Sequence, residues 1–214
     1  MADSGMTDDE LKVRIERMYA AIGATIEREM YVGGGTKVEG ELRKLEGGGI
    51  NFKFGGKLTD SQLANLAWNA IHNLAIFFEY CKEWGKHNGV AYQEIANVRD
   101  NAREIRIIED LHNSEKHPAQ RANQSGVSPK LTDLRQVLRV QGGVELVFEG
   151  PGGLTARGKD VSLVVYGAIL NSKTGTLVGD LHDVIDEALQ AWEQFLRTKG
   201  LVDAAGTPAL SGRH

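Results

Sequence analysis

The chain has 214 residues, 41% hydrophobic and 25% charged, and this balance is typical of a globular protein and excludes a disordered chain. A formal net charge of -4 excludes a uniformly basic protein that coats nucleic acid, and the single cysteine, Cys81, excludes an intramolecular disulfide scaffold. The N-terminal residues MADSGMTDDELK lack the basic and apolar regions of a signal peptide. We therefore expect a cytoplasmic protein with no membrane segment and no membrane partner.

The first predicted element is a helix from Thr7 to Met30. Thr7 and Glu10 have the spacing of a capping box, in which each side chain binds the other's backbone N–H. Apolar residues then recur every three or four positions, as they do on one face of a helix. They are Leu11, Ile15, Met18, Ile22 and Ile26.

A glycine-rich stretch, residues 31–58, follows this helix. Glycine at this density disfavours regular structure, so we expect a flexible insertion. Within it, Ile50 to Phe54 (INFKF) alternates and predicts one short strand. Gly55 to Thr59 (GGKLT) resembles the end of a phosphate-binding loop but lacks the upstream glycine spacing. A nucleotide or phosphate sensor is therefore the weaker alternative.

A helical pair is predicted next. The first helix begins at Thr59 or Asp60, runs to about Gly85 and is apolar on most sides, as in a central helix. Its polar residues form a stripe that includes His72 and faces water, a partner helix or a polar cavity. The second helix runs from about Ala91 to at least Leu111.

The last third of the chain predicts strands and one helix. A hairpin is predicted from two strand-like segments, residues 134–140 and 144–150, which QGG separates. A third strand is predicted at residues 161–170. Asp180 is placed to cap a final amphipathic helix. We expect an α+β fold: a helical bundle with a small antiparallel sheet of about three strands and a C-terminal amphipathic helix.

The expected organisation is a single domain over 1–198. Its helical part covers about 7–118 with the insertion at 31–58, and its strand-and-helix part covers about 130–198. The small, glycine- and proline-punctuated residues 199–214 predict a flexible tail.

Residues suited to chemistry gather between Glu109 and Pro118, in EDLHNSEKHP. They are Asp110, His112, Asn113, Lys116 and His117. Two histidines near a carboxylate can supply an acid and a base, and a lysine can hold a phosphate. The two histidines are five residues apart, about 140° around a helix, which is not the shared face of a zinc helix. We expect no metal and no cofactor. A structural role, in which these side chains bind the free carbonyl groups at the end of the helix or hold the loop that follows, fits these residues equally well.

This stretch resembles the HEPN superfamily, small helical proteins that include metal-independent ribonucleases. The family motif is an arginine, a polar residue, three free positions and a histidine. His112-Asn113-Ser114-Glu115-Lys116-His117 has that spacing with histidine in place of the arginine. Arg106 with His112 gives a second arginine-to-histidine spacing, although Ile107 follows the arginine where the motif has a polar residue. The resemblance covers residues 59–118.

The resemblance implies cleavage of RNA across the cleft of a homodimer. In this chain it implies that His117 transfers protons, that Asn113 orients, and that His112 or Arg106 steadies the phosphate. The candidate catalytic residues are His117, His112 and Asn113. The candidate substrate-binding residues are Arg106, Lys116, Asp110 and His72. The alternative is a non-catalytic helical dimerisation or interaction module in which the same motif stabilises the fold.

Overall fold

A computed structural model describes residues 5–30, 34–44, 50–55, 57–116, 124–150 and 152–203. The chain divides into two compact units, each built from separate stretches of sequence. The first, here the helical unit, comprises Met1–Gly23, Trp68–Thr132 and Ala168–His214. The second, here the sheet unit, comprises Ala24–Ala67 and Asp133–Gly167.

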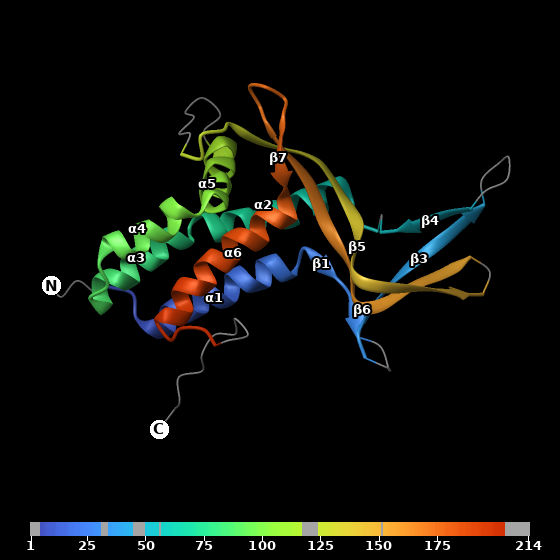
Figure 1. Ribbon diagram of the computed structural model, residues 1–214, viewed down its shortest axis with the longest axis horizontal. Coiled ribbons are helices and arrows are strands. Elements are labelled where there is room, and N and C mark those ends of the chain that lie inside the picture. Colours follow the sequence, from blue (N-terminus) through green and yellow to red (C-terminus); the bar gives the residue numbers. More distant parts are fainter. Residues whose placement is uncertain are drawn as a thin grey trace. The chain divides into compact units, whose positions relative to one another are not determined.

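The structure has helices and strands in both halves of the sequence (Figure 1). The helices are α1 (Asp8–Gly23), α2 (Asp60–Ala75), α3 (Phe77–Asn88), α4 (Tyr92–Asn101), α5 (Arg103–Lys116) and α6 (Leu181–Thr198). The strands are β1 (Ile26–Glu27), β2 (Glu29–Met30), β3 (Thr36–Lys44), β4 (Ile50–Phe54), β5 (Pro129–Glu149), β6 (Gly153–Asn171) and β7 (Leu177–Asp180). None of the helices in the described ranges is both long and apolar enough to cross a bilayer.

Local capping signals set the beginnings of three helices. Thr7 and Glu10 form the predicted capping box at α1, and the Thr59 N–H donates to the Gln62 side chain (2.8 Å) before α2. Asp180 accepts a hydrogen bond from the backbone N–H of Asp183 at α6 (2.9 Å). These predicted starts are confirmed because a cap depends on residues only three positions apart.

The core of the helical unit contains an aromatic cluster on α3 and α6. Trp192 is fully buried and makes edge contacts with Phe77 (5.3 Å between centroids) and Phe195 (6.3 Å). Edge-to-face aromatic pairs add stabilisation beyond the burial of their surface. The apolar face predicted for α1 is also buried, from Leu11 to Ile22.

Three helix boundaries differ from the prediction. The first helix ends at Gly23, and residues up to Met30 form β1 and β2. The helix predicted from residue 59 to 85 divides at Ile76 into α2 and α3. The next divides at Ala102, whose backbone is extended (φ −103°, ψ 104°). Alanine strongly favours helix, so the sequence carries no local signal for this break.

The strands form a seven-stranded, curled antiparallel sheet, so the prediction of a helical bundle with about three strands was wrong. In the sheet unit β6 lies between β3 and β5, and β4 pairs with the outer edge of β3. β7 pairs with the end of β6 that belongs to the helical unit. The mixture of helix and sheet agrees with the coarser α+β prediction.

The glycine-rich stretch contains one predicted strand and one strand that the sequence pattern did not predict. Its predicted strand at 50–54 is β4, but it also contains β3, which was expected to be flexible. Gly40 pairs with Phe54 across the two strands, and a Cβ on Gly40 would lie 2.6 Å from the Phe54 ring. Here glycine makes room for an aromatic side chain instead of breaking the strand.

The predicted hairpin was misplaced for a similar reason. Strand β5 continues through Gly142 and Gly143, and the reversal into β6 comes after Glu149. A Cβ on Gly158 of β6 would lie 2.6 Å from the Gly143 carbonyl oxygen, so the two backbones approach closely there. In the segment expected as a tail, Leu201 and Val202 are buried.

Candidate functional site

The candidate residues of α5 extend from Arg106, near its beginning, to Lys116 at its end, but only part of the predicted set is described. Arg106, Asp110, His112 and Asn113 have described positions. Lys116 is the last residue of α5, and only its backbone is described. His117 lies outside the described residues. Arg106 and Asn113 are seven residues apart, two helical turns, and so share one side of α5.

Asp110 holds the chain that follows α5. Its carboxylate oxygens accept hydrogen bonds from the backbone N–H of Gln124 (3.1 Å) and from the N–H and hydroxyl of Ser125 (2.8 and 2.6 Å). Asp110 is only 2% exposed. A buried carboxylate needs such partners, so Asp110 is a bracing residue, and it forms no ion pair with Arg106 although the two are four residues apart on α5.

Two histidines from different helices meet in the helical unit. Nδ1 of His72 on α2 lies 3.0 Å from Nε2 of His112 on α5, and their ring centroids are 5.0 Å apart. His112 is 8% exposed, whereas His72 is exposed. In such a pair one nitrogen carries a proton and donates, and the other has a free lone pair and accepts.

The pairing orients the His72 ring. Its Nδ1 is engaged with the buried His112, which leaves Nε2 as the nitrogen directed away from that bond. The hydrogen bond fixes the position of the His72 ring, and Nε2 can accept a proton in the tautomer in which Nδ1 donates to His112. The arrangement therefore resembles a base together with its orienting group.

Amide groups flank His72 on α2. The side-chain N–H of Asn73 donates to the backbone oxygen of Asn69 (2.8 Å) and to its side-chain oxygen (3.1 Å). The predicted polar stripe is thus partly bonded within its own helix, while His72 reaches across to α5. Among the described residues, Asn113 makes no hydrogen bond through its half-buried side chain.

Arg106 has an unsatisfied guanidinium nitrogen. Its Nε is buried without a hydrogen-bond partner, and within the described ranges its side chain forms no ion pair. A half-buried cation without a carboxylate favours an anion as its partner. Sequence reasoning identified Arg106 by its spacing from His112 but not this lack of a partner, which depends on Asp110 turning to Ser125.

Glu109, beside Asp110 on α5, was not predicted as a site residue. Burial raises its pKa to about 7, the charge of Arg99 on α4 lowers it, and Asp110 raises it further. A protonated carboxyl near neutral pH can donate a hydrogen bond. The sequence does not indicate that Glu109 is buried, because an exposed glutamate at the same position of the helix would give the same sequence pattern.

The part of the chain that the structure describes contains no cluster of three or more histidine, cysteine or acidic side chains arranged to hold a metal ion. No protein-family model matches this chain, and no curated protein or solved structure matches it either.

Proposed function

We propose that this protein acts on RNA, with His72 as a proton-transferring group and His112 as the positioning residue behind it. The contact that carries the proposal is the 3.0 Å approach of His72 Nδ1 to His112 Nε2, which orients an exposed imidazole from a buried one. Proton transfer by a positioned histidine contributes about 10²–10⁴-fold to rate. The HEPN resemblance supplies the substrate class.

In the proposed reaction, Nε2 of His72 removes the proton of a ribose 2′-hydroxyl. The 2′-oxygen attacks the adjacent phosphorus, the bond to the 5′-oxygen breaks, and the products are a 2′,3′-cyclic phosphate and a 5′-hydroxyl. The departing 5′-oxygen takes a proton from a general acid, the role that the resemblance implies for His117. Arg106, a cation without an ion-pair partner within the described ranges, stabilises the negative charge that accumulates on the phosphate oxygens. No step uses a metal.

The test is cleavage of a single-stranded RNA by the purified full chain in EDTA. We expect His72→Ala to lower kcat at least about 100-fold in a protein that still unfolds cooperatively, because His72 is exposed and water can replace its bond to His112. His87→Ala, which removes an exposed histidine of α3, is the matched control and should cleave like wild type. His112→Ala should change the pH profile as well as the rate, since it acts through His72.

Two results would overturn this assignment. One is an intact RNA after prolonged incubation with the wild-type protein. The other is cleavage that persists in His72→Ala, which would move the chemistry to other residues. The proposal includes a cytoplasmic location and, as the resemblance implies, a homodimer. Sedimentation equilibrium of the wild-type chain measures whether the dimer forms.

The second candidate is a non-catalytic dimerisation or interaction module. The observation that favours it is a set of exposed apolar side chains on one face of the sheet unit. Val144, Leu146 and Phe148 alternate along β5 and so share a face, and the Phe148 ring lies 6.2 Å from that of Phe52 on β4. Exposed apolar groups of this kind often mark interaction surfaces. No RNA cleavage, with a destabilised His112→Ala variant, would make this candidate the better one.

A further inference from the structure

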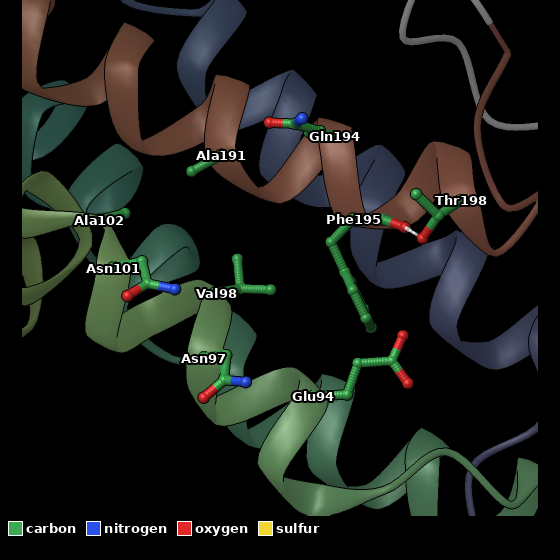
Figure 2. Close-up of a pocket in the computed structure, with 9 residues that line it drawn as sticks. All are labelled: Glu94, Asn97, Val98, Asn101, Ala102, Ala191, Gln194, Phe195 and Thr198. Atoms are coloured by element: carbon green, nitrogen blue, oxygen red, sulfur yellow. Dashed lines mark hydrogen bonds between the residues drawn. The ribbon is translucent and has the colours of Figure 1, made fainter.

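A groove in the helical unit has the composition of a small-molecule site. It lies between α4 and α6 and has a volume of about 440 Å³. Figure 2 shows Asn97, Val98 and Asn101 on the α4 side and Ala191, Gln194 and Phe195 on the α6 side. Known small-molecule sites have volumes of several hundred Å³, an apolar lining and a few placed polar groups.

The lining supplies an apolar surface. Val98, Ala191 and Phe195 provide it, and the Phe195 side chain extends from α6 towards α4 (Figure 2). Phe195 is 6% exposed and its ring is held by edge contacts with Trp84 and Trp192. A fixed aromatic ring beside small aliphatic groups suits a flat, apolar ligand body.

Uncharged amides supply the polar groups. Asn101 and Gln194 are exposed, and within the described part of the chain neither side chain has a hydrogen-bond partner. Asn97 accepts a hydrogen bond from Gln93 (2.8 Å) through its oxygen, which leaves its NH₂ group available. Each amide presents a donor and an acceptor side by side, the pattern that reads the edge of a nucleobase.

The groove offers little net charge to a ligand. Among the described lining residues the one ionised side chain is Glu94, and it forms an ion pair with Lys199. With its carboxylate compensated in this way, the groove attracts neither a phosphate nor a strong cation by its charge.

We propose that this groove binds a neutral planar heterocycle of the nucleobase class. The ring lies against Val98, Ala191 and the small part of Phe195 that is exposed, and the polar edge of the heterocycle bonds to the amides of Asn101 and Gln194. The inference is independent of the proposed function, because it involves neither His72 nor Arg106.

The experiment is isothermal titration of the full chain with adenosine, cytidine, guanosine and uridine as probes. We expect saturable binding of at least one nucleoside with one site per chain, and no tighter binding of its 5′-monophosphate. The double variant Asn101→Leu/Gln194→Leu should weaken that binding at least about tenfold, since it removes both amides that would contact the edge of the base. Gln190→Leu, an exposed amide on α6 outside the lining, is the control and should bind like wild type.

Three outcomes would overturn the proposal. The first is the absence of saturable binding by all four nucleosides at millimolar concentration. The second is unchanged affinity in the double variant, with a melting temperature that shows it folded. The third is monophosphate binding that is tighter than nucleoside binding and is lost in salt, because it would assign recognition to a phosphate site elsewhere.

Discussion

Glu109 is a buried carboxyl whose charge is costly to the fold. It is 8% exposed, and burial is the main reason why its pKa rises from an ordinary 4.5 to about 7. Between these two values the folded chain binds more protons than the unfolded chain does. The stabilisation from this group is therefore complete below about pH 4.5 and is lost as the pH rises through about 7.

Glu109→Gln should consequently stabilise the protein only at higher pH. Glutamine is uncharged throughout, so we expect an unchanged free energy of unfolding near pH 4.5 and an increase of up to roughly 3 kcal/mol near pH 8. Urea unfolding at both pH values measures this. Glu115→Gln, at an exposed position of α5, is the control and should have little effect at either pH. An equal effect of Glu109→Gln at both values would contradict the argument.

The histidine pair shows what a sequence pattern can predict about a site and what it cannot. The sequence identified His72 as part of a polar stripe and His112 as part of a polar motif, and suggested that the two faced one site. Their direct contact joins residues 40 positions apart. No local period encodes such a contact, because it depends on how α2 and α5 pack.

At the scale of elements, the β3–β4 pair depends on a glycine in mid-strand. Gly40 lies opposite Phe54, and Phe54 packs against a small core formed by Val38, Ala156, Val161 and Leu163. A Cβ at Gly40 would lie 2.6 Å from the ring and 2.8 Å from the Lys53 carbonyl oxygen. A contact this short forces the ring or the backbone to move.

Gly40→Ala should therefore destabilise the sheet unit. We expect a loss of about 1–3 kcal/mol in the free energy of unfolding, the usual cost of overpacking. Circular dichroism during urea unfolding would measure it. At Gly23, the last residue of α1, a Cβ would meet no atom within 4 Å, so Gly23→Ala is the matched control and should be neutral or slightly stabilising. A neutral Gly40→Ala would show that Phe54 moves without cost.

At the scale of the whole molecule, three elements belong to both compact units. The division falls within α2, within β5 and within β6. A helix or strand is a continuous hydrogen-bonded element, and interrupting it exposes backbone groups at the break. We therefore expect the units to unfold together although each has its own buried residues.

The tryptophans allow a test of that expectation. All three, Trp68, Trp84 and Trp192, belong to the helical unit, so tryptophan fluorescence reports that unit alone. Val161→Ala, in the core of the sheet unit, should remove about 1–3 kcal/mol. The fluorescence midpoint in urea should fall with the circular dichroism midpoint. A fluorescence transition that stays in place while the other shifts would show independent units.

The sequence by itself determined the features that depend on neighbouring residues. They include the capping box at Thr7, the cap of α6 at Asp180 and the strand at 50–54. Each is encoded within a few positions, because a cap spans three residues and a strand alternates with a period of two.

Only the tertiary structure decided which glycines lie inside strands, where helices break and which polar groups meet. Gly40 and Gly143 look like loop residues until the side chain or backbone that approaches each of them is known. Ala102 leaves the helix without any local signal, and His72 meets His112 through the packing of two helices. These outcomes depend on contacts between distant residues, whose energies outweigh local preference.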